Sequence, residues 1–256
     1  MGGVEAQLCG SAGYKRFIVE ALDQTDVDIV ARAVTSVEAG GLRFFTRSAP
    51  SYIRARSGRD VQTIEANRFP FRNAPNAGKP GLIVVGSITD VTASQRREAV
   101  ESGTVCSVEM QARELYMGPS KRKELIKVSN AIKHLLGQGK HIMLYTSGYY
   151  QHDGEHALVA KQRVLMALAE IVPDFVRDIG FVLTKGSDTG YLVMSEGLHM
   201  ERSIFDGLLM PGVGVCFAGP ESRAPGLPVI LFPGNTGSQE ALREAVQLVE
   251  QAQKGT

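Results

Sequence analysis

Short apolar runs alternate with helix-like segments from residue 81 to the end of the chain. Three of the runs end in a turn of small residues and then open into a helix, and these units span residues 81–99, 181–197 and 228–250. Such alternation is typical of βα units, which pack as a mostly parallel sheet with helices on both faces. The pattern therefore predicts a three-layer α/β/α sandwich over residues 81–256.

The segments between these three units follow the same alternation. Further strands are expected at residues 104–108, 141–145 and 210–217, and helices at residues 92–100, 120–136 and 157–172. Thr92 and Gln95 have the spacing of a capping box, in which two side chains cap the first turn of a helix. The helix after the first strand is therefore expected to begin at Thr92.

Residues 1–59 carry a second, smaller pattern. The expected elements are, in order, a strand at 16–21, a helix at 25–40, a strand at 42–46 and a short helix at 49–56. Thr25 and Asp28 give the cap signal of the first helix. The pattern predicts a small βαβ unit before the sandwich, and the strand at 42–46 would leave an exposed edge that favours pairing, for example in a homodimer.

Residues 60–80 differ from both flanking regions. They contain Pro70, Pro75 and Pro80 and show no apolar periodicity. A proline-rich segment without periodicity is typical of a connection between domains. Residues 60–80 are therefore predicted to be a linker between the βαβ unit (1–59) and the sandwich (81–256).

Composition narrows the function classes. The 256 residues are 43% hydrophobic and 21% charged, with a formal net charge of +1 and no tryptophan. These values describe a globular chain without the electrostatic field that attracts nucleic acid or a membrane surface. No apolar run is long enough to span a bilayer, and no signal peptide is evident. Three well-separated cysteines without a CxxC pair suggest a reducing compartment, so a cytoplasmic protein is expected.

The three small-residue turns are candidate anion sites. Glycines let the backbone approach a phosphate, hydroxyls donate to it, and a helix start adds positive potential. The residues that meet these needs are Ser87, Thr89, Gly186, Ser187, Thr189, Gly190, Gly234 and Asn235. An alternative is that such residues merely form the βα turns found in any α/β protein. Three turns on one sheet edge, without a P-loop or a GxGxxG motif, keep both interpretations open.

Several ionisable residues have two interpretations. Asp188 can cap the helix that it begins, or it can hold a ribose hydroxyl or a hydrated Mg²⁺. Lys185 can neutralise phosphate charge, or it can be a solvated side chain. His152 and His156 have the i,i+4 spacing of metal ligands, but Gly154 and the lack of a third ligand argue against a metal site.

Four segments together resemble a known family. They are VVGSITDVTASQ (84–95), LTKGSDTG (183–190), MPGVGVCFAGPESRAPGLPVILFPGNTG (210–237), and FIVEALDQTDVDIVARAV (17–34) with RFFTRSAPSYIRAR (43–56). The first three resemble the nucleotide-binding domain of the four-carbon acid sugar kinases, which phosphorylate threonate, erythronate and 3-oxo-tetronates. The fourth resembles the closing βαβ piece of that family's substrate domain, so residues 1–59 would be a remnant of it.

The resemblance implies ATP and Mg²⁺ as cofactors and a four-carbon sugar acid as substrate. Nucleotide contacts carry over to three groups of residues: Ser87 and Thr89; Gly186, Ser187, Asp188, Thr189 and Gly190; Gly234 and Asn235. Three of these depart from the family's pattern, because Thr89 stands where serine is usual, Ser187 replaces a glycine and Gly190 replaces a serine. The family's acidic Asp-Asp motif is absent from this chain, so no catalytic residue is assigned.

The sequence-based hypothesis is ATP-dependent phosphoryl transfer to a hydroxyl of a four-carbon sugar acid, with this chain supplying the ATP-binding half. The chain alone is expected to bind nucleotide and to fail at transfer, unless a separate polypeptide supplies the rest of the substrate domain. One alternative is a non-catalytic module that senses a ligand or serves assembly. Another is a different α/β enzyme with a sugar phosphate in the same crevice.

Overall fold

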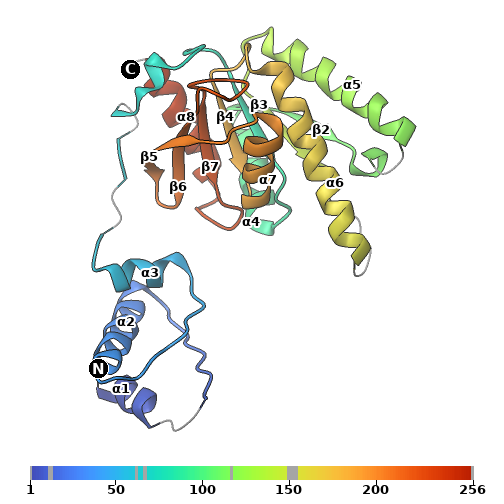
Figure 1. Ribbon diagram of the computed structural model, residues 1–256. Helices are drawn as coiled ribbons and strands as arrows, with labels where there is room; N and C mark the ends of the chain where they lie inside the picture. Colours follow the sequence, from blue (N-terminus) through green and yellow to red (C-terminus); the bar gives the residue numbers. More distant parts are fainter. Residues whose placement is uncertain are drawn as a thin grey trace. The chain divides into compact units, whose positions relative to one another are not determined.

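The computed structural model describes residues 2–10, 14–60, 63–65, 68–115, 118–148 and 155–254. The chain divides into two compact units, Met1–Gln62 and Thr63–Thr256 (Figure 1). The first unit ends near the predicted boundary at residue 59, whereas most of the predicted linker, from residue 63 onward, belongs to the second unit. Within the described ranges, no helix combines the length and apolar character needed to cross a membrane.

The second unit is built on a seven-stranded sheet with the strand order β2-β3-β1-β4-β7-β6-β5. The strands are β1 (Gly81–Val85), β2 (Cys106–Met110), β3 (Ile142–Thr146), β4 (Phe181–Lys185), β5 (Ser203–Met210), β6 (Val213–Ala218) and β7 (Pro228–Phe232). The first five strands in this order pair in parallel, and β6 and β5 add an antiparallel hairpin at the edge. The mostly parallel sheet that was predicted from the sequence is confirmed.

Helices cover both faces of this sheet. The main helices are α4 (Asp90–Glu101), α5 (Gly118–Leu136), α6 (Glu155–Ile171), α7 (Ser187–Leu192) and α8 (Ala241–Lys254). In β1, Leu82 and Val84 join the apolar cluster that includes α5 and α6, while Ile83 and Val85 join the cluster that includes α8. Side chains alternate between the faces of a strand, so the two clusters lie on opposite faces. The predicted three-layer α/β/α sandwich is therefore confirmed.

Short helical turns complete the second unit. They are η2 (Pro70–Asn73), η3 (Ala112–Leu115), η4 (Val172–Phe175) and the π-helical η5 (Val193–Gly197). In η2, Phe71 is completely buried and its ring centroid lies 6.0 Å from that of Phe217 in β6. Arg72 Nε also donates to the Ala252 carbonyl in α8 at 3.4 Å. Part of the predicted linker is thus core, because its aromatic side chains cover the α8 side of the sheet.

The predicted strand at 210–217 is in fact a hairpin. Met210 ends β5, Val213 begins β6, and Gly212 adopts a φ of 77° in the turn between them. The sequence pattern does not predict β5, because its first three residues, Ser203 to Phe205, are exposed and show no alternation of apolar and polar positions. An edge strand with weak burial leaves a weak signal.

The two predicted helix caps are wrong by two or three residues. The N-cap of α4 is Thr89, whose hydroxyl accepts the Thr92 N–H at 3.3 Å, so Thr92 and Gln95 do not form a capping box. In the first unit, the N-cap of α2 (Gln24–Ala39) is Asp23, which accepts the Asp26 N–H at 3.1 Å. In both cases a suitable oxygen lies earlier in the chain and caps the helix first.

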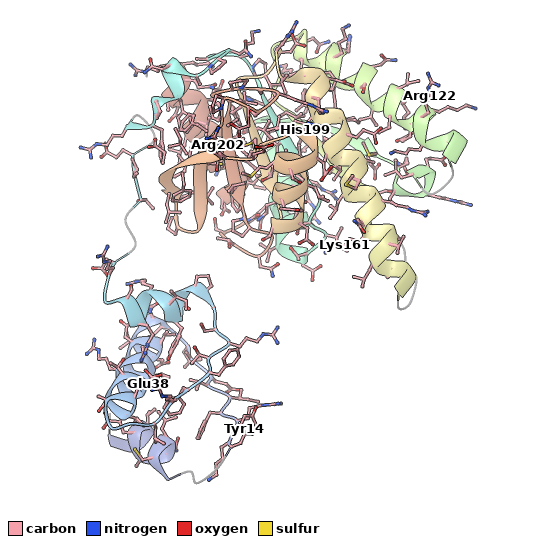
Figure 2. The ribbon with its side chains drawn as sticks, in the orientation of Figure 1. Tyr14, Glu38, Arg122, Lys161, His199 and Arg202 are labelled. Atoms are coloured by element: carbon pink, nitrogen blue, oxygen red, sulfur yellow. The ribbon has the colours of Figure 1, made fainter. Side chains whose placement is uncertain are left out.

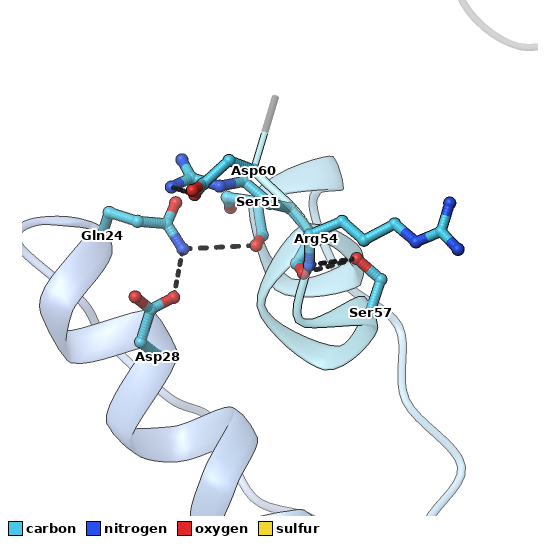
Figure 3. A network of polar contacts seen from close by, with 7 residues as sticks. Gln24, Asp28, Ser51, Arg54, Ser57 and Asp60 are labelled. Carbon is cyan, nitrogen blue, oxygen red and sulfur yellow. Dashed lines mark hydrogen bonds and ion pairs between the residues drawn. The ribbon is translucent and has the colours of Figure 1, made fainter. Parts of the chain in front are cut away.

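The first unit is helical. It contains α1 (Gly2–Cys9), α2 and α3 (Pro50–Ser57). Its core is small: Leu8, Ala33, Val34 and Val37 are buried. Gln24 Nε2 joins α2 to α3 by donating to the Ser51 carbonyl at 3.4 Å, and within α2 it also donates to Asp28 Oδ1 at 2.7 Å (Figure 3).

The predicted βαβ unit is only partly formed. The helix is present as α2, but residues 16–21 and 42–46 have no regular secondary structure and no strand pairing in the described part of the unit. Ile18, Leu22 and Phe45 are 88%, 100% and 101% exposed. An isolated pair of strands is only marginally stable in water, so these apolar segments need further strands to form a sheet.

Candidate functional site

Three loops meet at the carboxyl ends of the adjacent parallel strands β1, β4 and β7. We call this place the loop junction, formed by residues 86–89, 186–190 and 233–238. The Ser87 N–H donates to the Lys185 carbonyl at 3.2 Å, and the Gly186 N–H donates to the Phe232 carbonyl at 2.8 Å. These bonds continue the pairing of the strands into the loops, so the three predicted turns lie side by side.

Hydroxyl groups hold the first loop to the third. Thr92 Oγ1 lies 2.8 Å from Ser87 Oγ and 3.0 Å from the Gly234 carbonyl oxygen. Thr89 Oγ1 donates to the same carbonyl at 3.0 Å. The sequence prediction included Ser87, Thr89 and Gly234, and the structure brings these three together.

Two glycines allow the loops to approach so closely. Gly186 has a φ of 114°, a backbone conformation that residues with a side chain rarely adopt. A Cβ atom at Gly234 would lie 2.9 Å from Ser87 Oγ and 4.0 Å from the Gly186 Cα atom. Because Gly186 and Gly234 have no side chain, the backbones of the second and third loops can lie this close together.

The side chain of Lys185 contacts the backbone of the third loop. Its side chain is completely buried, with Nζ 2.6 Å from the Pro233 carbonyl oxygen and 4.0 Å from the centroid of the Phe232 ring. Burial lowers the pKa of this amine to about 8. Lys185 is thus neither solvated nor exposed to a ligand, and it acts on the third loop through the backbone.

The other predicted residues fall into two groups. Ser187, Asp188 and Asn235 are exposed, and Asp188 forms an ion pair with Lys161 of α6 (Figure 2 labels Lys161). Thr189 and Gly190 are buried. The Thr189 hydroxyl lies beneath Gly186, 3.2 Å from where a Cβ would be, so its contact in the structure is with the protein.

A pocket of about 260 Å³ opens beside the loop junction. It lies between the carboxyl ends of β1 and β3, whose following helices, α4 and α6, leave to opposite faces of the sheet. Ligands of open α/β sheets bind in such crevices. Ser87 and Thr92 line the pocket as well as the junction, so the two sites are continuous.

The pocket contains side chains that the sequence did not single out. The Arg96 guanidinium lies 3.9 Å from the centroid of the Tyr145 ring, and Glu109 and Ser147 also line the pocket. These residues come from α4, β2, and the end of β3. They belong to no motif, and only the strand order brings β3 next to β1, which explains why the sequence did not reveal the pocket.

The described residues include no group of three or more His, Cys, Asp or Glu side chains that could hold a metal ion. Of the two histidines weighed as ligands, His152 lies outside the described residues, and the side chain of His156 in α6 is not described.

Comparison with known proteins adds two findings. The family model described as the nucleotide-binding C-terminal domain matches residues 82–242. This range includes all three loops of the junction and the pocket. A search of curated proteins finds no match.

The fold is similar to that of solved structures. A domain of unknown function (DUF1537) from Bordetella bronchiseptica, a domain-swapped dimer with bound citrate, has a TM-score of 0.57 and 20% identity, with 90% of this chain and 52% of that chain covered. A putative tRNA synthase from Salmonella typhimurium LT2 has a TM-score of 0.55 and 15% identity, with 94% of this chain and 53% of that chain covered. The chain thus spans about half the length of these structures.

Proposed function

Because the chain belongs to the family of nucleotide-binding C-terminal domains, we propose that its second unit binds the phosphates of ATP at the loop junction. The observation that carries the proposal is the meeting of the first, second and third loops at Gly186 and Gly234, where side chains are absent and the loops approach one another closely. The helix start of α4, capped by Thr89, adds positive potential at the same edge.

The residues of the loop junction would have two roles, contact with the phosphates and support of the loops. Backbone N–H groups of the first and second loops, other than those of Gly86, Ser87 and Gly186, which donate to strand carbonyls, would bind phosphate oxygens, and the Ser87 hydroxyl would orient them. Thr89, Thr92 and Lys185 would hold the loops in place without touching the nucleotide, since their polar atoms bond to the protein. Such preorganised donors stabilise the charge that develops during phosphoryl transfer.

Mg²⁺ would be held mainly by the phosphates and by water, as is usual for this ion. Asp188 is the carboxylate at the second loop, and it is more than half exposed at the start of α7. Its ion pair with Lys161 would have to open before Asp188 could bind a hydrated Mg²⁺. The ion would supply neutralising charge to the transferring phosphoryl group.

For the full reaction, we propose transfer to a hydroxyl of a four-carbon sugar acid. The support is the resemblance of the loop motifs to the four-carbon acid sugar kinases, together with a fold similar to DUF1537, the domain of that family. The exposed apolar segments 16–21 and 42–46 would pair with strands of a substrate domain, supplied by a separate polypeptide or by a second copy of this chain. The similar Bordetella bronchiseptica domain is itself a domain-swapped dimer.

Thermal unfolding with and without millimolar Mg-ATP tests nucleotide binding. At about 100 times Kd, binding adds about 2.7 kcal/mol to the free energy of unfolding and raises Tm by several degrees. Gly234→Ala places a Cβ 2.9 Å from Ser87 Oγ and should remove most of this shift. Gly137→Ala is the matched control, because its Cβ would have an ordinary contact at 3.4 Å, remote from the junction.

The outcome separates the proposed function from its alternatives. A shift with Mg-ATP that Gly234→Ala abolishes and Gly137→Ala retains supports the nucleotide site. If Mg-ATP gives no shift, the chain is better explained as a non-catalytic module that senses another ligand or serves assembly. If sugar phosphates shift Tm and ATP does not displace them, a different α/β enzyme is favoured.

A further inference from the structure

The outer edge of β5 is open over residues 202–206, which we call the open edge. β5 is the last strand in the sheet order, and within the described residues its neighbouring strand is β6 (Figure 1). Near its other end the Ile64 N–H donates to the Leu208 carbonyl at 2.8 Å, so that part of the edge is covered. Ser203, Ile204 and Phe205 are exposed, and the two large apolar side chains are 69% and 60% exposed. An uncovered edge with apolar side chains favours the addition of another strand.

The backbone bonds at the start of β5 show which of its groups face outward. The Arg202 carbonyl accepts the Gly219 N–H at 3.1 Å, so the backbone of Arg202 faces β6. The direction of the backbone groups alternates along an antiparallel strand, so those of Ile204 also face β6, whereas those of Ser203 and Phe205 face away from it. These outward N–H and C=O groups can bond to a strand of another molecule.

The sequence of the open edge is complementary to itself. An antiparallel pairing of two copies centred on Ile204 places Arg202 of each copy opposite Asp206 of the other, so two pairs of opposite charge form about the two-fold axis. Opposite charges on directly opposed residues stabilise a sheet. In the same register Ser203 lies opposite Phe205, so the outward backbone groups of the two copies face one another. Charge and backbone direction therefore favour the same register.

Both charged side chains are available for this pairing. The Arg202 side chain is 76% exposed (Figure 2 labels it), and its ion pair with Glu221, at 3.6 Å, is of the surface kind that contributes little to stability. Asp206 forms no ion pair with any described side chain. The register of β5 against β6 also shifts at Asp206, just before the covered part of the edge at Leu208. The pairing is thus limited to the open edge, which suits a closed dimer.

From these features we propose that two copies of this chain associate through the open edge of β5, in an antiparallel and two-fold symmetric pairing centred on Ile204. The sheets of the two copies then form one continuous sheet across the axis. This contact is separate from the pairing considered above for segments 16–21 and 42–46. It involves neither the loop junction nor the pocket, so it goes beyond the proposed function and does not depend on it.

Reversing the two charges one at a time tests the pairing, with analytical ultracentrifugation of the full chain as the measurement. Arg202→Asp places aspartates opposite each other and Asp206→Arg places arginines opposite each other, so each variant alone should dimerise at least about tenfold more weakly than wild type. An equimolar mixture of the two variants restores both pairs of opposite charge and should form a heterodimer. Arg122→Asp is the matched control, because Arg122 is exposed on α5, which packs near β2 at the opposite edge of the sheet (Figure 2).

A cross-link tests the register independently of charge. In the proposed pairing Ile204 and its copy form a non-hydrogen-bonded pair, with Cα atoms about 4.5 Å apart, and disulfides span about 4.4–6.8 Å between Cα atoms. In a Cys9→Ser background, which removes the exposed native cysteine, Ile204→Cys should form a covalent dimer under mild oxidation. Ile126→Cys, at an exposed position of α5, is the matched control and should cross-link much more slowly. Far-ultraviolet circular dichroism shows whether each variant is folded.

Three results would overturn the inference. The first is a wild-type chain that stays monomeric over the concentration range of ultracentrifugation. The second is a dimer that both charge reversals leave unchanged, or that mixing the two variants does not restore, since the copies would then associate through another surface. The third is equal cross-linking of Ile204→Cys and Ile126→Cys. Neither assay contains nucleotide, so a failure of Mg-ATP binding would leave this inference unaffected.

Discussion

Lys185 places an ionisable amine in the core of the second unit, where no described carboxylate pairs with it. Two carbonyl oxygens of the third loop, from Pro233 and Thr236, accept from its ammonium group at 2.6 and 3.5 Å, and the Phe232 ring lies beneath it. These contacts offset only part of the cost of burying the charge, which is why the pKa of Lys185 falls to about 8. The protonation of one residue thus affects the third loop directly.

This depressed pKa makes stability depend on pH. Between pH 8 and 10 the unfolded chain keeps the lysine proton and the folded chain has lost it, so the free energy of unfolding rises with pH. Lys185→Met keeps the apolar stem but does not titrate. The free energy of unfolding of this variant should therefore rise by about 2 kcal/mol less between pH 8 and 10 than that of wild type. Urea unfolding of both proteins at several pH values measures the difference.

A second buried group acts in the opposite direction in the same pH range. Burial raises the pKa of the Cys216 thiol to about 11, so its contribution to stability is lost as pH rises from about 9 to 11. Cys216 is present in both wild type and Lys185→Met, and its effect cancels in their difference. Parallel pH profiles for the two proteins would contradict the role assigned to Lys185.

At the scale of elements, Gln95 ties α4 to the third loop. Its side chain is completely buried, and Nε2 donates to the Thr236 carbonyl at 2.9 Å and to the Ser238 carbonyl at 2.7 Å. The sequence motif around Gln95 was interpreted as a helix cap, but the amide instead crosses to a loop far away in the chain. The position of the third loop is therefore set by α4 as well as by β7.

Replacing this amide should loosen the third loop. Gln95→Leu removes a completely buried amide and its two hydrogen bonds to the carbonyl groups of Thr236 and Ser238, and we expect it to lower the free energy of unfolding by about 1–3 kcal/mol and to weaken Mg-ATP binding. Gln138→Leu, at an exposed glutamine, is the matched control and should change neither quantity appreciably. Chemical denaturation and calorimetry provide the two measurements, and unchanged nucleotide affinity in Gln95→Leu would argue against a loop held by α4.

The strands that the sequence predicts well are those buried on both faces. β1 and β7 are continuous apolar runs and β4 begins as one, each followed by a small-residue turn, so their positions, and the meeting of their loops, follow from the sequence. β5 was missed because its exposed positions do not alternate with buried ones. The pocket could not be predicted, since Arg96, Glu109 and Tyr145 come from separate elements that only the strand order brings together.

At the scale of the whole chain, the second unit begins before its first strand. Phe69 and Phe71 precede β1, yet they are 3% and 0% exposed and belong to the apolar cluster on the α8 side of the sheet. Prolines in this segment predict a linker, but a proline-rich segment can also be the first turn of a short helix whose aromatic residues face the core. Burial of particular side chains, which the local pattern does not reveal, decides between the two.

Phe71 should therefore behave as a core residue. Phe71→Ala should lower the free energy of unfolding by about 3–5 kcal/mol, as for other buried phenylalanines. Phe205→Ala, in the exposed part of β5, should cost at most about 1 kcal/mol. Urea unfolding of the full chain compares the two variants, and equal effects would show that residues 63–80 are a linker after all.

The order of the strands also bears on how the protein folds as it is synthesised. β1 pairs with β4, where Gly81 lies opposite Phe181, and β4 pairs in turn with β7 near the end of the chain. Pairings between such distant segments close long loops and are slow to form. β1 can pair with β3 earlier, but it must wait for most of the chain to leave the ribosome before β4 arrives on its other side. The three loops of the junction come together only at the end of that process, so a nascent chain completes the loop junction last.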